Sequence, residues 1–308
     1  MTGSGPLAIT GATGFVGQAV LDAAARQGLA VRALARREQP PRAGVEWLRG
    51  DLADGAALRR LVAGARAVLH VAGVKTAHPT GLHAGNAAGT EAVVEAARAG
   101  GVERLVFVSS LAARMPGLSA YGRSKRHAEE IVQTSGLDWT IVRPPAIYGP
   151  RDCDLLALFR AARWGVVPLP PPGRASVIHV DDLARLLLAL VAPAASPTTA
   201  ERIVDPDDGR PGGWSHRELA CAIGAALGRR RVWAPHLPAP LLRTAARFDS
   251  LLRREAARLT PDRAGYMIHP DWVCAPERAP PPDLWRPGIA TPQGLADTAR
   301  WYRAAGWL

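Results

Sequence analysis

Two side chains suited to proton transfer lie four residues apart in the segment Tyr121-Gly122-Arg123-Ser124-Lys125. On a helix, this spacing places the Tyr121 phenol and the Lys125 ammonium on one face. A free phenol has a pKa of about 10, and lowering it by one unit takes about 1.4 kcal/mol of preferential phenolate stabilisation. A positive charge such as that of Lys125 provides part of this energy, so we expect Tyr121 to act as a general acid or base.

The pair is unusual for a chain of this composition. The sequence holds four tyrosines, and Lys75 and Lys125 are its only lysines. An accidental Tyr-x-x-x-Lys in 308 residues with these counts has a probability of roughly 3%. The alternative, a surface helix pair without a chemical role, therefore requires a coincidence.

The elements that must position this pair alternate between short apolar runs and longer helical patterns in the first half of the chain. Such alternation is typical of β-α-β units that build a parallel sheet. The expected strands are Leu7–Thr10, Ala30–Leu34, Ala67–Val71, Arg104–Ser109 and Trp139–Val142. The expected helices are Val16–Gln27, Ala56–Ala63, Ala87–Ala99 and Tyr121–Thr134.

A glycine-rich turn joins the first expected strand to the first expected helix. Small residues there permit a tight turn and a close backbone approach to a pyrophosphate, and the helix N-terminus offers unpaired N–H groups. The spacing G-x-x-G-x-x-G differs by one residue from the common dinucleotide fingerprint, but its place at the first strand–helix junction favours dinucleotide binding over an incidental turn. The predicted contacts from this turn are Gly11, Thr13, Gly14, Phe15, Val16 and Gly17.

Two arginines follow the second expected strand, where an NAD-binding protein carries a carboxylate for the ribose 2′-hydroxyl. Arg36 and Arg37 occupy this place, and the first carboxylate is Glu38. Arginines form charge-assisted, bidentate contacts with phosphate, so the pair favours NADP(H) over NAD(H). Two solvated arginines in an arginine-rich chain remain the alternative.

Three further residues are predicted to contact the cofactor from the ends of later strands. A probable strand, the third along the chain, ends before Gly50; Asp51 and Leu52 follow it, and Asp51 would approach the adenine amino group. Ala72 belongs to a run of small residues that ends the fourth strand and lets the backbone pass close to the cofactor. The alternative for Asp51 is an ordinary helix N-cap.

Further motifs accompany the tyrosine–lysine pair over nearly the whole chain. They are Thr10–Gly17, Gly50-Asp51-Leu52, Asn86-x-x-Gly89-Thr90, Val108-Ser109-Ser110, Arg143–Pro150 and Ile178–Leu183. With these motifs the chain resembles the extended short-chain dehydrogenase/reductase family, also called the NAD-dependent epimerase/dehydratase superfamily. The resemblance implies an α/β fold, namely a doubly wound parallel Rossmann sheet with a smaller, mostly helical C-terminal substrate-binding region.

The resemblance also implies roles for individual residues. Ser110 would hydrogen-bond the substrate oxygen, Tyr121 would be the acid/base, and Lys125 would tune Tyr121 and hold the cofactor ribose. Ser109 is the alternative to Ser110. Arg143 would either border the nicotinamide or form a structural ion pair.

The expected reaction is the interconversion of a ketone and a secondary alcohol on a hydrophobic or lipid-like small molecule. Arg36 and Arg37 disfavour NAD, which most sugar epimerases and dehydratases retain. The stretch Leu111–Arg114 also lacks the acidic residue that sugar dehydratases use after the serine. The alternatives are a sugar-nucleotide epimerase/dehydratase and a non-catalytic NADPH-binding scaffold, although a scaffold has no need of an intact serine–tyrosine–lysine set.

Domain boundaries follow from where the alternating pattern loosens. Residues 1–150 are expected to form the dinucleotide-binding domain and residues 151–308 mainly the substrate-binding region. Two later segments within 174–210, Ser176–Val180 and Arg202–Val204, are expected to return to the sheet as strands. The family resemblance suggests a homodimer through the Ala87–Ala99 and Tyr121–Thr134 helices.

A basic amphipathic helix is expected between Pro240 and Pro261. Its apolar face comprises Leu241, Ala245, Phe248, Leu252 and Leu259, and its basic face comprises Arg243, Arg247, Arg254 and Arg258. One interpretation is a surface helix packed on its own domain, and the other is a basic element that touches an anionic membrane or guides a lipid-like substrate. Nearby Trp214, Trp233, Trp272 and Trp285 are expected to be mostly core residues.

Composition excludes several other classes of protein. The net charge is +11, but the arginines are dispersed and no nucleic-acid-binding module is present, so no nucleic-acid partner is expected. Cys153, Cys221 and Cys274 lie far apart, which indicates neither a metal site nor a disulfide framework. No apolar run approaches the roughly 20 residues of a membrane span, and no signal peptide is evident, so a cytoplasmic location is expected.

Overall fold

The computed structural model describes residues 5–75, 79–192, 196–253 and 259–308. Its centre is a seven-stranded sheet in the order β10-β6-β5-β4-β1-β2-β3, and every neighbouring pair is parallel. The strands are β1 (Leu7–Thr10), β2 (Val31–Ala35), β3 (Val45–Arg49), β4 (Ala67–His70), β5 (Arg104–Val108), β6 (Asp138–Val142) and β10 (Arg202–Val204). The chain order reverses between β1 and β4, and the carboxyl ends there form the crevice where such sheets bind ligands.

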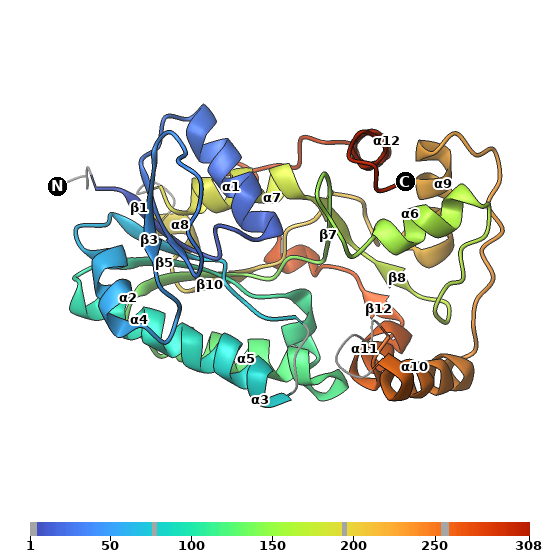
Figure 1. Cartoon of the computed structure of the whole chain (residues 1–308), viewed down its shortest axis with the longest axis horizontal. Helices are drawn as coiled ribbons and strands as arrows, with labels where there is room; N and C mark the ends of the chain where they lie inside the picture. Colours follow the sequence, from blue (N-terminus) through green and yellow to red (C-terminus); the bar gives the residue numbers. More distant parts are fainter. Residues whose placement is uncertain (1–4, 76–78, 193–195, 254–258) are drawn as a thin grey trace.

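Helices cover both faces of this sheet (Figure 1). α1 (Phe15–Arg26) and α7 (Val180–Leu190) pack together on one face and share a core with β1. α2 (Gly55–Val62), α4 (Gly89–Ala99) and α5 (Ala120–Gln133) cover the other face. Strands buried on both faces read as near-continuous apolar runs, as β1 and β4 do. The doubly wound Rossmann sheet expected from the sequence is therefore confirmed.

The C-terminal region is mostly helical and lies at one end of the molecule (Figure 1). Its helices are α6 (Leu156–Arg163), α9 (His216–Ala226), α10 (Ala239–Arg253), α11 (Pro261–Ile268) and α12 (Thr291–Ala304). Two small sheets join it, with strands β7 (Ala146–Tyr148), β9 (Val177–His179), β8 (Arg174–Ala175), β11 (Trp214–Ser215) and β12 (Asp271–Trp272). Two short helices, α3 (Pro79–His83) and α8 (Ser196–Thr199), lie in connections.

The structure corrects one strand prediction and one helix boundary. Arg202–Val204 returns to the central sheet as expected, but the segment expected at Ser176–Val180 forms β9 and pairs with β7 instead. The reason is that β10 already occupies the edge of β6. The helix expected from Ala87 begins as an α-helix only at Gly89, because a π-helical turn precedes it.

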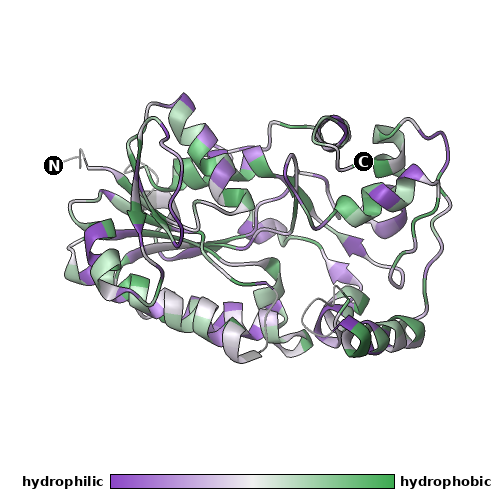
Figure 2. Cartoon of the chain, in the orientation of Figure 1, coloured by the Kyte–Doolittle hydropathy of each residue, from purple (hydrophilic) through white to green (hydrophobic). Residues whose placement is uncertain are grey.

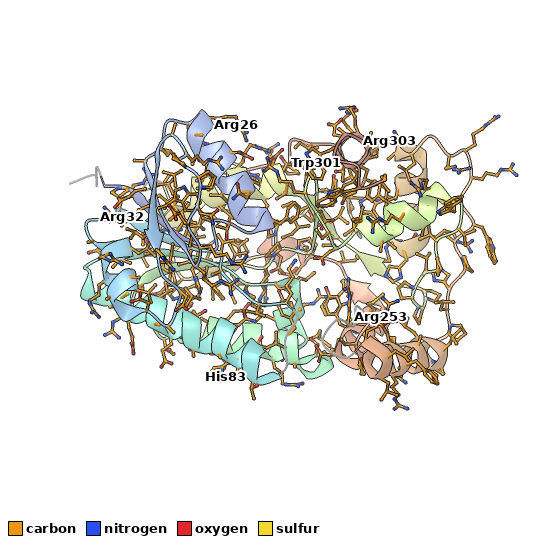
Figure 3. All side chains as sticks on the ribbon, viewed as in Figure 1. Arg26, Arg32, His83, Arg253, Trp301 and Arg303 are labelled. Carbon is orange, nitrogen blue, oxygen red and sulfur yellow. The ribbon has the colours of Figure 1, made fainter. Side chains whose placement is uncertain are left out.

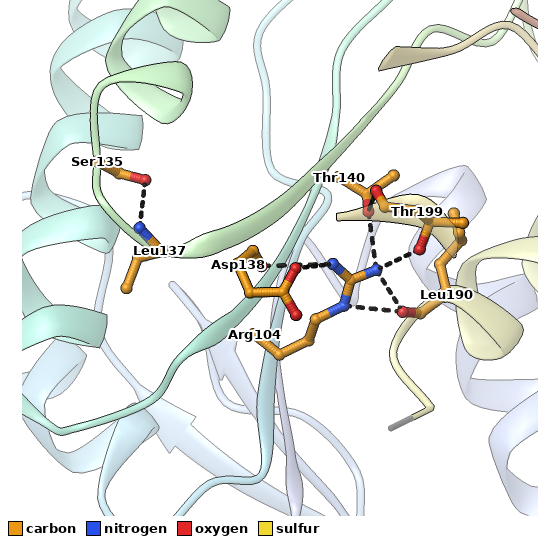
Figure 4. A network of polar contacts seen from close by, with 7 residues as sticks. All are labelled: Arg104, Ser135, Leu137, Asp138, Thr140, Leu190 and Thr199. Atoms are coloured by element: carbon orange, nitrogen blue, oxygen red, sulfur yellow. Dashed lines mark hydrogen bonds and ion pairs between the residues drawn. The ribbon is translucent and has the colours of Figure 1, made fainter. Parts of the chain in front are cut away.

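A buried arginine links β5 and β6 to two helices (Figure 4). Arg104 donates to Asp138 Oδ1 at 2.9 Å and to Thr140 Oγ1 at 2.8 Å. It also donates to the Leu190 carbonyl at the end of α7 and to Thr199 Oγ1 in α8. A buried charge is tolerated when its hydrogen bonds are satisfied, so this network stabilises the β5–β6 pair against α7 and α8.

The basic helix packs on its own domain, as the first interpretation expects, but through a different set of residues from the expected apolar face. In α10, Leu242 and Ala246 pack inward, whereas Leu241, Phe248 and Leu252 of the expected apolar face are exposed. Figure 2 shows hydrophobic stretches on this peripheral helix. Arg254 and Arg258 lie outside the described residues, and α10 is described as far as Arg253. Trp214, Trp272 and Trp285 are buried as expected, but Trp233 is exposed.

In the described part of the chain, no helix is both long and apolar enough to cross a membrane. The same residues contain no cluster of three or more histidine, cysteine or acidic side chains that could hold a metal ion. No disulfide links the three cysteines within the described residues, and only Cys274 is buried.

Candidate active site

Helix α5 carries Tyr121 and Lys125 on one face. Ser119 caps the helix, since its hydroxyl accepts from the Gly122 N–H at 2.9 Å. Gly122 has no room for a larger residue, because a Cβ there would lie 2.8 Å from the Ala112 carbonyl oxygen. The first turn of α5 is thus pressed against the loop after β5, and this close approach brings Tyr121 to Ser110.

Lys125 is buried beneath the carboxyl edge of the sheet. Its ammonium donates to the Val108 carbonyl at 3.0 Å and lies 5.0 Å from the centre of the Phe107 ring. Burial lowers the pKa of Lys125 to about 8, against the attraction of the Glu129 carboxylate. Gly73 makes room for it, because a Cβ at that position would lie 2.9 Å from the Lys125 Nζ.

Tyr121 and Ser110 are near enough for the serine hydroxyl to influence the pKa of the phenol. Burial raises the pKa of the Tyr121 phenol, whereas the Lys75 ammonium and a hydrogen bond with Ser110 oppose the rise. Ser110 is half-buried just after β5, and its Oγ also accepts from the Ala112 N–H at 3.3 Å. Ser109, the alternative serine, is buried and donates to Glu129 Oε1 at 2.5 Å, so it faces away from the phenol site.

Lys75 is a charged neighbour of Tyr121 that the sequence reasoning missed. Its ammonium forms an ion pair with Asp154 Oδ2 at 2.9 Å, and both side chains are about half exposed. Asn86 holds the adjoining backbone through hydrogen bonds with the Val74 N–H and carbonyl, at 2.7 and 2.9 Å. The sequence did contain a signal for Lys75, because lysine is rare in this chain. Lys75 and Lys125 are the only two lysines among 38 basic residues.

The glycine turn forms a cradle with no space for side chains. Gly11 has a φ of 73°, and a Cβ there would lie 2.5 Å from the Ala72 N. A Cβ on Gly17 would lie 2.1 Å from the Gly11 carbonyl oxygen, so α1 abuts the turn. Gly14 is the N-cap of α1 and provides no side-chain hydrogen bond to the helix. Exposed Thr13 and Gly14 thus leave the positive end of α1 open to an anionic group.

The other predicted cofactor residues gather along the same carboxyl edge, because β4, β1, β2 and β3 are neighbours in the sheet. Arg36 and Arg37 directly follow β2, and both are exposed. Asp51 is exposed after β3 and accepts from the Ala53 N–H at 2.9 Å. The alternative N-cap role of Asp51 was wrong, since Asp54 caps α2. Half-buried Phe15, Val16, Leu52 and Ala72 complete the set.

A buried, neutral histidine in β4 contacts threonines of β1 and α4 beneath the carboxyl edge of the sheet. His70 Nδ1 lies 2.6 Å from Thr10 Oγ1, and His70 Nε2 lies 3.0 Å from Thr90 Oγ1. Burial lowers the pKa of His70 to about 3, with a smaller contribution from Lys125. Thr10 Oγ1 also accepts from the Ala72 N–H at 3.3 Å, which ties the loop after β4 to β1.

Arg143 proves to be a structural ion-pair partner. It is 2% exposed, and its Nε donates to Glu129 Oε1 at 2.8 Å while its Nη2 bonds Glu129 Oε2. Such a bidentate pair also holds α5 to the end of β6, since Glu129 lies one turn beyond Lys125.

Comparison with known proteins agrees with this geometry. A family model described as NAD(P)H-binding matches residues 11–192. A ceramide reductase of Caulobacter vibrioides is 39% identical over 99% of this chain and 96% of its own. A 2-alkyl-3-oxoalkanoate reductase of Stenotrophomonas maltophilia is 32% identical over 73% of this chain and 76% of its own. The solved structure of UDP-N-acetylglucosamine 4-epimerase from Bacillus cereus has a TM-score of 0.71 at 16% identity, with 97% of each chain covered.

The chain therefore belongs to the NAD(P)H-binding proteins of the extended short-chain dehydrogenase/reductase superfamily. It is an NAD(P)-dependent oxidoreductase, and its relatives identify it more narrowly as a reductase.

Proposed function

We propose that this protein is an NADPH-dependent reductase that converts a ketone on a hydrophobic, lipid-like molecule into a secondary alcohol. The observation that carries the proposal is the gathering of Ser110, Tyr121 and the buried Lys125 where β5 and the start of α5 meet, beside the glycine cradle. The test is to follow the hydride of the reduced cofactor into the product.

The residues of the cradle fit a dinucleotide. Gly11, Gly14 and Gly17 leave the backbone open for a pyrophosphate, and Arg36 and Arg37 stand where a ribose 2′-phosphate would lie. Bound there, a reduced nicotinamide supplies the hydride for the carbonyl carbon.

The protein's own groups then manage the carbonyl oxygen. Ser110 donates a hydrogen bond to this oxygen and orients it, and Tyr121 gives it the proton that completes the alcohol. In this proposal Lys125 holds the cofactor ribose and tunes Tyr121. Lys75 adds a positive charge that lowers the pKa of Tyr121.

The lipid-like substrate class has two supports. The relatives named above act, by name, on a ceramide and on a 2-alkyl-3-oxoalkanoate, which are both hydrophobic. The segment after Ser110 is apolar, with Leu111, Ala112 and Ala113 each 1% exposed, so no carboxylate lies there for sugar dehydration.

We predict that Lys75→Met raises the pH at which the reductase loses activity. Ketone reduction needs the protonated phenol, so kcat/KM falls as the pH rises through the pKa of Tyr121. Lys75 lowers this pKa and Asp154 raises it. Loss of the ammonium should therefore move the descending limb of the pH profile to higher pH, whereas Asp154→Asn should move it to lower pH.

The control is Lys75→Arg, which keeps the charge and should restore the wild-type profile. Steady-state rates of cofactor oxidation over a pH series measure all three variants. If the descending limb of the pH profile stays in place in both Lys75→Met and Asp154→Asn, the role given to this ion pair is contradicted.

A further inference from the structure

Large apolar side chains are exposed mainly in the C-terminal region. Among the described residues, those with more than a third of their surface exposed are Met115, Trp164, Val166, Trp233, Leu241, Phe248, Leu251 and Leu252. None of them comes from the described part of the chain before Met115, which holds most of the dinucleotide cradle. Clustered exposed apolar surface marks an interaction site more often than chance exposure does.

Helix α10 provides the larger part of this surface. Leu241, Phe248 and Leu252 follow one another at seven- and four-residue spacing, which aligns them on one face of the helix. Phe248 is 59% exposed and Leu252 is 82% exposed, and Leu251 beside them is 73% exposed. An adjoining face, with Leu242 and Ala246, packs on α11 in a small cluster. The apolar stripe of α10 therefore points away from the fold.

Two tryptophans extend the surface toward α9. Trp164 is 75% exposed and Trp233 is 69% exposed. The strands of chain that carry them are paired, since the Trp233 N–H donates to the Gly165 carbonyl at 2.8 Å. Residues 227–238 connect α9 to α10 along this end of the molecule (Figure 1). We call the α10 stripe and the two tryptophans the apolar edge.

The apolar edge is bordered by positive charge. Residues 227–253 contain six arginines and a single acidic residue, Asp249. Asp249 is engaged by Arg253, which Figure 3 labels at the end of α10. Arg243 and Arg247 line a groove of about 140 Å³ against α11. Indole rings and arginines beside an apolar helix face are the combination found at the interface of anionic membranes.

We propose that the apolar edge docks on an anionic lipid surface, with α10 lying in the interface and the arginine-lined groove taking a lipid phosphate. A second copy of the chain fits this surface poorly, because a two-fold contact would set arginines against arginines. A dimer through α4 and α5 would leave the edge free.

Docking would serve the active site directly, and this part rests on the proposed reduction of a lipid-like ketone. α11 lies between α10 and the catalytic helix, and Asp262 Oδ1 accepts from the Ala120 N–H at 2.6 Å. The docked edge is thus one helix away from Tyr121, which shortens the path of a lipid from the bilayer to the phenol.

Vesicle binding tests the proposal with the whole chain. Phosphatidylcholine vesicles with and without phosphatidylglycerol are sedimented with the protein at low and high salt. The bound fraction should rise with the acidic lipid and fall with salt. Leu251→Ser combined with Leu252→Ser should weaken binding roughly 10-fold or more. Arg243→Gln combined with Arg247→Gln should weaken binding to acidic vesicles roughly 10- to 30-fold.

The matched control is Arg26→Gln combined with Arg60→Gln, which removes the same charge from exposed sites on α1 and α2. It should bind like the wild type. Absence of binding to acidic vesicles at low salt, or an equal loss in the control, would overturn the proposal. Light scattering provides another test. If the wild type is an oligomer and the double leucine variant is a monomer, the apolar edge binds a second copy of the chain, and the proposal is overturned. The assay needs no turnover, so its failure is separate from that of the reductase assignment.

Discussion

Replacing Tyr121 by phenylalanine should lower kcat by roughly 10²- to 10⁴-fold, the range typical for the loss of a general acid. The substitution keeps the ring and removes only the hydroxyl that contacts Ser110. The glycine cradle and the arginines after β2 lie elsewhere on the edge, so the Kd for NADPH should stay near that of the wild type. Steady-state kinetics and calorimetric titration of the cofactor measure the two effects separately.

A structural tyrosine provides the matched control. The Tyr302 hydroxyl donates to the Asp152 carbonyl at 2.7 Å within the C-terminal core. Tyr302→Phe should lower the free energy of unfolding by about 0.5–1.5 kcal/mol and leave kcat nearly unchanged. If Tyr121→Phe instead turned over substrate at close to the wild-type rate, the assigned chemistry would be wrong, and a non-catalytic scaffold would be favoured.

The second large effect concerns the choice of cofactor. Arg36→Asp should weaken NADPH binding about 10- to 150-fold, because it removes a charge-assisted contact worth about 1.5–3 kcal/mol. The new carboxylate would also repel the 2′-phosphate and accept from the ribose hydroxyls of NADH. The preference for NADPH over NADH should therefore shrink or reverse.

Calorimetric titration of the wild type and the variant with both cofactors measures this preference. Arg26→Asp, on the exposed end of α1 (Figure 3), makes the same charge change away from the cradle and should leave both affinities nearly unchanged. Equal affinity of the wild type for the two cofactors would contradict the role given to Arg36 and Arg37.

Much of the fold could be predicted from the sequence because its elements are buried in a regular way. All five expected strands end within one residue of the observed positions, for example Ala30–Leu34 against Val31–Ala35. Parallel strands that are covered on both faces appear in the sequence as apolar runs. Glycines and helix-capping residues mark where these runs begin and end. The glycine cradle was equally visible, since the close approach of Gly11 to Ala72 excludes every side chain.

Other features depend on contacts between distant segments, which periodicity does not report. The spacing of Leu241, Phe248 and Leu252 indicates a helix face but not whether another element covers it. The same holds for Ser176–Val180. Its sequence indicates a strand but not the neighbour with which the strand pairs, which is β7, because β10 pairs with β6. Lys75 and Asp154 are 79 positions apart, and only the tertiary fold brings them together beside Tyr121.

The most direct measurement of the central claim follows the hydride itself. NADPH carrying deuterium at C4 of the nicotinamide is supplied with hydrophobic ketones, including a 2-alkyl-3-oxoalkanoate and a ceramide that carries a ketone. Mass spectrometry should find an alcohol with one deuterium at the carbinol carbon, and one NADP⁺ for each alcohol formed. No deuterated alcohol from any lipid ketone, together with turnover of a sugar nucleotide on tightly retained NAD without net cofactor oxidation, would contradict the account.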